Sequence, residues 1–313
     1  MKSHIHKINL LETLPNNTKI KLDENIKSYL FNALKKEYPT LKELGQHIKI
    51  NSYNIGRYSS GTRAIPLMTF IKLLKISELN LNDFQNKIKI KLSSTGKYLK
   101  IGPFLDIDEK WIYISELIRG DGHITKNMWS IQFLNKENHL IETVKNFFLD
   151  IGLPKKRITL MNTNNCNHLV IRSMLLAYIL KNIFNINPGK RKDENIPDFI
   201  KENEKFTISA IRGFFDAEGS VYISKNKFKR TRSVRLSSIS LNYIKNIKSM
   251  LKRLDISTNL YTEKRKNNDI YRLVLRGRKN IMKFKHTIKP NHPKRYKLLN
   301  ILLNSYTRFS FQS

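Results

Sequence analysis

The sequence predicts an α+β protein in which a small helical domain precedes a core built from two repeats. The main observation is an internal repeat, because WIYISELIRGDGHI, from Trp111 to Ile124, matches FTISAIRGFFDAEGSVYI, from Phe206 to Ile223. Each segment is an apolar, helix-like run that ends at an acidic residue followed by glycine and then becomes strand-like. Similar strand and helix patterns follow both copies, so we expect two units of one pseudo-dimer.

The composition of the chain indicates which class of partner it binds. Its 313 residues include 58 Lys and Arg against 25 Asp and Glu, a formal charge of +33, with 40% apolar residues for packed cores. A charge of this size favours a polyanionic partner, and nucleic acid is the natural one. No long apolar or basic amphipathic segment opens the chain, so we expect no membrane association and a cytoplasmic location. A single cysteine, Cys166, excludes an internal disulfide.

The N-terminal part is expected to contain a polar tail at 1–25, a helical domain at 26–86 and a lysine-rich linker at 87–104. Within the domain, Thr40 and Glu43 form a capping-box pattern, and Leu41, Leu44 and Ile48 then fall on one helical face. A second helix is expected from Ser52 to Tyr58.

This pair of helices resembles the helix-turn-helix of the phage-repressor class, including the tail Tyr58-x-x-Gly61-x-Arg63-x-Ile65-Pro66. Gly45 departs from the alanine usual in that class. The second helix of such a motif enters the major groove by its N-terminal end. The residues expected to face DNA are Ser52, Tyr53, Asn54 and Arg57. The alternative is a small three-helix packing module that does not contact DNA.

The two core repeats are expected at 105–203 and 204–313. In the first, Gly122 to Thr125 and Trp129 to Leu134 form a hairpin with Trp129, Ile131 and Phe133 on one face. The matching strands of the second repeat are Ser220 to Ser224 and Ser233 to Ser238. A helix and two more strands follow in each repeat, at 140–149, 158–162 and 168–172, and at 243–254, 260–265 and 271–276.

The helix ends of the repeat break a local rule. A carboxylate in the last turn of a helix is unfavourable because that end carries partial negative charge, whereas a following glycine is the expected cap. Ser209, Gly213 and Ala217 form a stripe of small residues that would let the two helices pack closely and bring both helix ends together. Ile112, Glu116 and Gly120 hold the matching positions, and Glu116 is expected to pair with Arg212.

At these residues the chain resembles the single-chain, two-motif LAGLIDADG homing endonucleases. The nine-residue motif aligns with Ile114 to Gly122 and with Ile211 to Gly219. The resemblance implies an αββαββα repeat, a DNA-binding saddle and catalytic metal bound by Asp121 and Glu218, with Mg²⁺ or Mn²⁺ as cofactor. Arg119 departs from the first aspartate of the motif, whereas Asp216 keeps it.

The resemblance also implies polar and basic groups near the scissile phosphate. Asn135 and Lys136 occupy the position of the polar pair, with Ser238 equivalent in the second half, and Lys190 and Lys294 match the late lysines. The alternative for these lysines is plain phosphate contact. Strand alternation makes further residues base or phosphate contacts: Ser130, Gln132, Arg172, Arg235, Tyr261, Glu263, Arg272, Arg276 and Arg278.

The sequence therefore predicts a monomeric endonuclease that makes a double-strand break in DNA at a long site. Met1 at the start and Phe311-Gln312-Ser313 at the end, in place of a nucleophile and His-Asn, favour an intron-encoded or free-standing gene over an intein. Two alternatives use the same fold. One is a splicing maturase that binds intron RNA, and the other is a DNA-binding transcription regulator that has lost catalysis.

Overall fold

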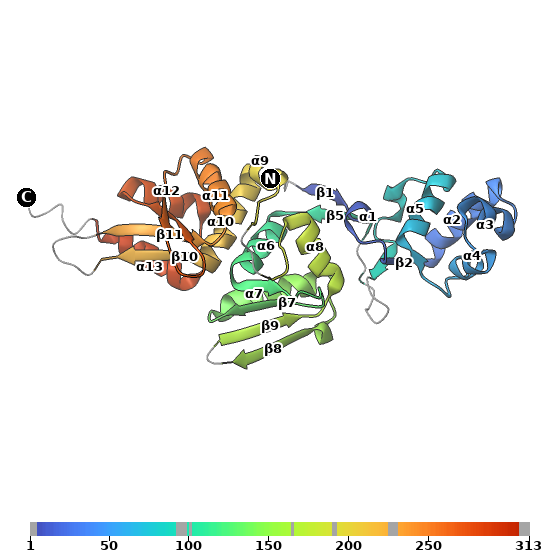
Figure 1. The fold of residues 1–313 in the computed structure, drawn as a ribbon, viewed down its shortest axis with the longest axis horizontal. Coiled ribbons are helices and arrows are strands. Elements are labelled where there is room, and N and C mark those ends of the chain that lie inside the picture. The colour runs from blue at the N-terminus through green and yellow to red at the C-terminus, as the bar shows by residue number, and fades with distance from the viewer. Residues whose placement is uncertain are drawn as a thin grey trace, which may run out of the picture. The chain divides into compact units, whose positions relative to one another are not determined.

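The computed structural model describes residues 5–91, 99, 102–163, 166–189, 193–224 and 231–306. Residue contacts divide the chain into two compact units. The N-terminal unit comprises Lys7–Asp106 together with Ser173–Ile179, and the core unit comprises Met1–His6, Ile107–Arg172 and Leu180–Ser313 (Figure 1).

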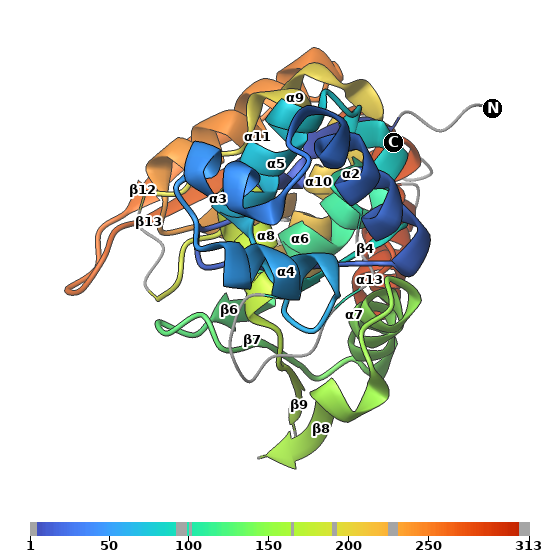
Figure 2. The same cartoon turned by 90° about the vertical axis from the view of Figure 1, so that its right-hand side faces the viewer.

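The N-terminal unit combines a bundle of helices with two small sheets (Figures 1 and 2). Its elements are β1 (His6–Asn9), α1 (Leu10–Thr13), β2 (Lys19–Leu22), α2 (Glu24–Glu37), α3 (Leu41–Ile48), α4 (Ser52–Ser59), β3 (Ile65–Pro66), α5 (Leu67–Ser77), the 3-10 helix η1 (Leu81–Phe84), β4 (Ile88–Lys91) and β5 (Phe104–Ile107). The capping box at Thr40 is confirmed, since its side chain accepts the N–H of Glu43 and the Glu43 carboxylate accepts the N–H of Thr40.

Three expectations for this unit are wrong. The domain is not all-α, because β3, β2 and β4 form a three-stranded sheet and β1 pairs with β5. The expected tail 1–25 holds β1, α1 and β2, and the expected linker 87–104 holds β4 and the start of β5. The physical reason is alternation: β2 reads KIKL and β4 reads IKIK, with Ile20, Leu22, Ile88 and Ile90 buried in the core.

The core unit contains the same series of elements twice. The first series is α6 (Glu109–Asp121), β6 (Gly122–Ile124), β7 (Ile131–Asn135), α7 (Asn138–Asp150), β8 (Ile158–Thr163), β9 (Cys166–Ile171) and α8 (Met174–Phe184), with η2 (Lys155–Arg157) before β8. The residues of α8 up to Ile179 are counted with the N-terminal unit, and those from Leu180 with the core. The second is α10 (Glu204–Glu218), β10 (Gly219–Ile223), β11 (Arg232–Ser238), α11 (Leu241–Arg253), β12 (Asn259–Glu263), β13 (Ile270–Leu275) and α12 (Arg278–Ile288). Helix α9 (Asp198–Glu202) lies between the series, and α13 (Pro293–Asn304) follows the second.

The two four-stranded sheets have one topology. Their strand orders are β6-β7-β9-β8 and β10-β11-β13-β12, and neighbouring strands are antiparallel throughout both sheets. Gly122 pairs with Phe133 in the first sheet, and Gly219 pairs with Leu236 in the second. Asn135 and Ser238, each two residues further along, therefore hold equivalent positions. This repetition confirms the mixed α+β class.

Helices α6 and α10 pack against each other at the centre of the core unit. A Cβ at Gly213 would lie 2.6 Å from the Tyr113 carbonyl oxygen and 2.9 Å from Glu116 Cβ. No side chain fits at that position without moving the facing helix, so the stripe of small residues in α10 serves the close approach that the sequence predicts. Among the described residues, no helix is long and apolar enough to cross a membrane.

Candidate active site

Each motif carboxylate is the last residue of its helix, Asp121 in α6 and Glu218 in α10. The following glycines are not left-handed caps, because Gly122 has φ −118° and Gly219 has φ −72°. Lack of space requires glycine there instead: a Cβ at Gly122 would lie 2.7 Å from the Gln132 carbonyl oxygen, and one at Gly219 would lie 2.4 Å from the Phe215 carbonyl oxygen.

The two helix ends meet. A Cβ at Gly120 would lie 2.3 Å from Ala217 Cβ and 3.2 Å from Glu218 Cγ, so α6 touches α10 beside its terminal carboxylate. Burial and the charge of Glu218 raise the pKa of Asp121 from 3.8 to about 7. Two carboxylates thus share a region where both helix dipoles are also negative.

Arg295 is a cation built into this region, and its role was not predicted from the sequence. Its guanidinium donates to the carbonyl oxygens of Phe215 and Ala217, over 3.0 and 2.7 Å, and to that of Asp216. It thereby caps the C-terminal end of α10, and its charge acts on Asp121 and Glu218. The basic run after His292 was a signal, but only the fold shows that Arg295, rather than Lys294, contacts the helix end.

Two hollows flank the paired helix ends. The Asp121 hollow is lined by Asp121, Leu134, Asn135, Lys136, Gly219, Ser220, His292, Lys294 and Arg295, among others. The Glu218 hollow is lined by Glu218, Ser237, Ser238, Ile239, Gly122, His123, Arg119, Gly189, Glu194 and Tyr243, among others. Leu134, Asn135 and Lys136 are the equivalents of Ser237, Ser238 and Ile239, so each hollow combines the end of one repeat's hairpin with the start of the other's.

The predicted polar pair lies in the Asp121 hollow. Asn135 donates its side-chain amide to Asp121 Oδ2 over 2.8 Å, and Asn135 Oδ1 accepts the N–H of Glu137. Ser238 Oγ accepts the N–H of Ser240 in the same way. Lys136 and Lys294 line the hollow with exposed side chains. Lys190 lies outside the described residues, although Gly189 lines the Glu218 hollow.

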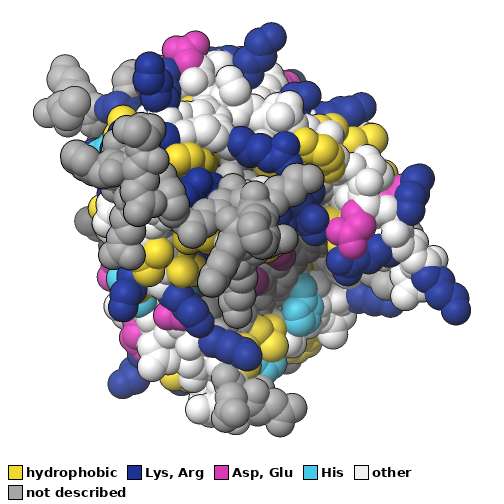
Figure 3. Space-filling view, turned by 90° about the vertical axis from the view of Figure 1, so that its left-hand side faces the viewer, with side chains coloured by type: hydrophobic (Ala, Val, Ile, Leu, Met, Phe, Trp, Pro, Cys, Tyr) yellow, Lys and Arg dark blue, Asp and Glu magenta, His cyan; other side chains and the backbone are white. Residues whose placement is uncertain are grey.

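The predicted arginines of the second sheet gather on one face. Arg235 pairs with Val274, and Arg272, two residues along, pairs with Ser237, which places both arginines on the same side. Arg235 stacks over Tyr222 with the guanidinium carbon 4.0 Å from the ring centroid, and Arg276 donates to the Tyr261 hydroxyl. Burial and the charges of Arg272 and Arg276 lower the pKa of Arg235. Lysine and arginine side chains are scattered over the surface in Figure 3, with few acidic ones.

The first sheet presents a different surface. Gln132 bonds to His168, and Arg172 donates to Thr159 over 2.5 Å, on the face where Leu134 and Met161 are also exposed. Ser130 is only 8% exposed, since it belongs to the turn that bonds to Thr125. Burial argues against the predicted base contact by Ser130. Trp129 is 51% exposed and does not share the buried face of Ile131 and Phe133, because β7 begins only at Ile131.

In the N-terminal unit, the four predicted DNA-facing residues lie on α4, with Ser52, Tyr53 and Asn54 in its first turn and Arg57 in its last. Tyr53 is 69% exposed, Arg57 lies over its ring, and Asn54 accepts a hydrogen bond from Arg63 over 2.7 Å. Ser52 is the first residue of the helix, after the Asn51 cap. A Cβ at Gly45 would lie 2.6 Å from the Ile50 carbonyl oxygen, which explains glycine at this turn.

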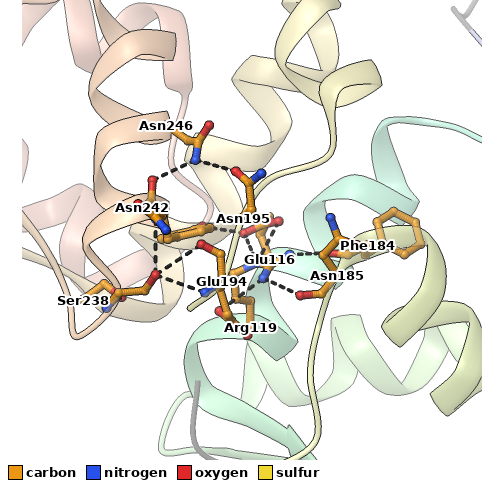
Figure 4. Close-up of polar contacts among 11 residues, drawn as sticks. Glu116, Arg119, Phe184, Asn185, Glu194, Asn195, Ser238, Asn242 and Asn246 are labelled. Atoms are coloured by element: carbon orange, nitrogen blue, oxygen red, sulfur yellow. Dashed lines mark hydrogen bonds and ion pairs between the residues drawn. The ribbon is translucent and has the colours of Figure 1, made fainter. Parts of the chain in front are cut away.

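Arg119 and Glu116, the residues that depart from the motif, are both buried, and their charged groups form ion pairs and hydrogen bonds. Arg119 forms ion pairs with Glu116 over 3.0 Å and with Glu194 over 3.1 Å, and Tyr243 donates to Glu116 (Figure 4). The expected Glu116–Arg212 pair is wrong, because Arg212 donates to the Ile288 carbonyl oxygen over 2.6 Å. In a buried network of this kind, each charge is stabilised by its partners. Removal of one charged side chain therefore lowers the free energy of unfolding by about 3–5 kcal/mol.

The carboxylate pair fits a hard divalent cation. Asp121 and Glu218 supply oxygen ligands at the two helix ends that meet, and the charge of Glu218 adds to burial in raising the pKa of Asp121. The described residues contain no group of three or more His, Cys, Asp or Glu that would enclose a metal without further ligands. Water and phosphate oxygens would have to complete the coordination, which Mg²⁺ accepts.

Fold and site together define a two-repeat α+β protein with a paired-carboxylate centre. Residues 205–289, which lie in the second repeat and include its motif, match the family model of the LAGLIDADG-like domain. An uncharacterised protein of Methanocaldococcus jannaschii is 27% identical over 186 residues, which cover 57% of this chain and 68% of that protein.

Two of the solved structures that are similar to this chain have low sequence identity to it. The crystal structure of I-DmoI in complex with DNA and Ca is 20% identical with a TM-score of 0.45, covering 61% of this chain and 97% of that chain. Full-length DUF199/WhiA from Thermatoga maritima is 14% identical with a TM-score of 0.42, covering 64% of this chain and 61% of that chain.

Proposed function

We propose that this chain is a site-specific endonuclease that makes a double-strand break in DNA with the help of a divalent metal ion, Mg²⁺ or Mn²⁺. The observation that carries the proposal is the meeting of Asp121 and Glu218 at two closely packed helix ends. Such a placement of carboxylates opposes helix dipoles and costs stability, so it calls for a functional explanation.

In this proposal Asp121 and Glu218 hold the metal, which activates water and stabilises charge on the phosphate. Asn135 fixes one oxygen of Asp121 and leaves the other for the metal. Arg295 offsets the negative end of α10 and keeps Glu218 in place beside α6. Lys136 and Lys294 extend into the same hollow, where exposed ammonium groups suit a phosphodiester backbone.

The two sheets contact the two halves of a long site, and the hollow of each repeat serves one strand. Arg235, Arg272 and Arg276 provide base and phosphate contacts in the second half, and Gln132 and Arg172 in the first. Helix α4 of the N-terminal unit binds DNA by the helix-turn-helix mode through Ser52, Tyr53, Asn54 and Arg57. The protein acts as a monomer, because one chain holds both carboxylates.

The test is a cleavage assay on DNA that spans the insertion site of the gene. Wild type should cut both strands with Mg²⁺ or Mn²⁺, whereas Asp121→Asn and Glu218→Gln should bind the same site without cutting it. Each substitution should also abolish the rise in melting temperature that Mn²⁺ gives the wild type. A mutant that cuts at the wild-type rate would exclude that carboxylate as a ligand.

The same experiment separates the two alternatives. A transcription regulator would bind a specific site with the metal present and cut nothing. A maturase would stimulate splicing of its intron RNA in the absence of DNA cleavage at any site of the intron-less allele. Specific DNA binding should weaken steeply with salt in all cases where phosphate contacts dominate.

A further inference from the structure

Arg119 and Asp216 hold the same position in the two motifs, two residues before the carboxylates Asp121 and Glu218. Both are buried, with Arg119 at 5% and Asp216 at 0% exposure. One is a cation and the other an anion, so the pseudo-symmetry of the fold is kept while the charge is reversed. Neither Arg119 nor Asp216 is one of the two residues proposed to bind metal.

Asp216 holds the turn that leads into α13. Its carboxylate accepts the backbone N–H groups of Asn291 and His292 over 2.9 and 3.1 Å, and the Tyr113 hydroxyl over 3.0 Å. His292 caps α13, whose first turn carries Lys294 and Arg295 into the Asp121 hollow. Asp216 therefore determines where the basic end of α13 lies relative to Asp121.

Arg119 holds the corresponding segment of the first repeat, the one that follows α8. It donates to carbonyl oxygens there, whereas Asp216 accepts from N–H groups. Its guanidinium donates to the carbonyl oxygens of Phe184 and Asn185, and its ion pair reaches Glu194 (Figure 4). The backbone N–H and carbonyl oxygen of Glu194 bond to Ser240, which ties the segment to the start of α11. Arg119 and Glu194 line the Glu218 hollow.

The charge reversal has a local cause. Helices α8 and α12 are aligned by their last residues, Phe184 and Ile288, and each is followed by a residue with positive φ. Counted from these ends, Pro188 is the equivalent of His292. Proline has no N–H, so a carboxylate at position 119 would lack one of the two backbone donors that Asp216 uses. A guanidinium binds the preceding carbonyl oxygens instead.

We propose that Arg119 and Asp216 are positioning residues for separate hollows, Arg119 for the Glu218 hollow and Asp216 for the Asp121 hollow, so that each governs the cutting of one DNA strand. The inference rests on the proposed nuclease function for its strand-specific part. Each residue acts through the segment that it holds, not through contact with DNA or metal.

The first test follows the two strands of a labelled duplex separately. Arg119→Lys keeps the buried charge but cannot reach both glutamates and both carbonyl oxygens, and Asp216→Asn keeps the shape but loses acceptors. Each variant should cut one strand about 10²-fold more slowly than the other, the size of effect expected from a misplaced reacting group, and the surviving nicks should lie in opposite strands. Arg232→Lys is the control, because Arg232 clamps Ser305 and lines neither hollow.

The second test does not require cleavage. Amide hydrogen exchange should become faster at Asn291 and His292 in Asp216→Asn, and at Glu194 in Arg119→Lys, with the other segment unchanged in each variant. Equal slowing of both strands, or faster exchange throughout α6 and α10, would overturn the proposal and leave a general packing role. If the exchange changes are local but the wild-type protein cuts no DNA, the positioning role of the two residues would be supported and the nuclease function rejected.

Discussion

Asn135 donates its side-chain amide to Asp121 over 2.8 Å, and this bond favours the ionised carboxylate against the burial that disfavours it. Burial and the charge of Glu218 prevail, since the pKa of Asp121 is raised to about 7. Through Asp121 alone, the folded metal-free protein binds more protons than the unfolded chain between pH of about 4 and 7, so this carboxyl's contribution to the free energy of unfolding falls as the pH rises. His292 acts in the opposite sense, because burial and the charge of Arg295 lower its pKa from 6.5 to about 4.

The first prediction follows from this sign. Asp121→Asn removes the buried charge, so at pH 8 and without metal the mutant should be more stable than wild type by about 1–2 kcal/mol, allowing for solvent screening. The difference should vanish near pH 3, where both side chains are neutral. Urea unfolding in the presence of a chelator at pH 3 to 8 measures it. A difference between mutant and wild type that stays constant over this range would contradict the cause assigned to the pKa shift.

The second prediction concerns the α6–α10 contact. Gly213→Ala would place a methyl group 2.6 Å from the Tyr113 carbonyl oxygen, so we expect a loss of about 2–3 kcal/mol through forced separation of the helices. Gly56→Ala is the matched control, because the added methyl group in α4 would meet only Leu41 at 3.6 Å. That change should stabilise the protein by about 0.5–1 kcal/mol. Thermal unfolding of both variants measures these changes in stability. Equal changes in melting temperature for the two variants would show that α6 and α10 pack less closely than described.

A third prediction addresses α4. Tyr53→Ala removes an exposed side chain from its first turn, and Arg57→Ala removes the partly buried cation in its last turn that lies over the Tyr53 ring, so they should weaken specific DNA binding by about 1–3 kcal/mol each while leaving the cleavage rate at saturating protein unchanged. Tyr29→Ala, which removes an exposed tyrosine from α2, should not alter affinity. Footprinting should show protection lost on one flank only, because the N-terminal unit occurs once. Unchanged affinity in both α4 variants would remove this helix from the interface.

The fourth prediction concerns the arginine face of the second sheet. Arg235→Ala should cost about 1–3 kcal/mol of DNA affinity and change base preference in one half of the site only. Lys252→Ala, on α11, which covers the opposite side of the sheet, is the control and should change affinity little. Binding titrations with a library randomised in each half provide the measurement. A uniform loss across all sequences would mean that Arg235 contacts phosphate alone.

Local signals made the repeats and the carboxylate pair predictable from sequence. Each nine-residue motif contains the end of a helix, the acidic residue that terminates it and the glycine that follows. The alternation of apolar and polar residues in 131–135 and 232–238 predicts the strands. Arg295 and Arg119 were not predictable in their roles, because their acceptors are carbonyl oxygens that lie far away in the chain. The strands β2 and β4 were missed although their alternation was visible, because lysine-rich composition was interpreted as tail and linker.

The sheet of the N-terminal unit has a consequence for how this unit can be inherited. Its central strand β2 pairs with β3 and with β4, so residues 19–22 and 88–91, on either side of the four helices, are joined edge to edge. Removal of the chain before residue 26 would delete β2 and expose Ile88, and removal of the chain from residue 87 onward would delete β4 and expose Ile20. Exchange of this unit between genes must therefore carry both flanking strands, and a helix-only fragment would be a poor unit of recombination.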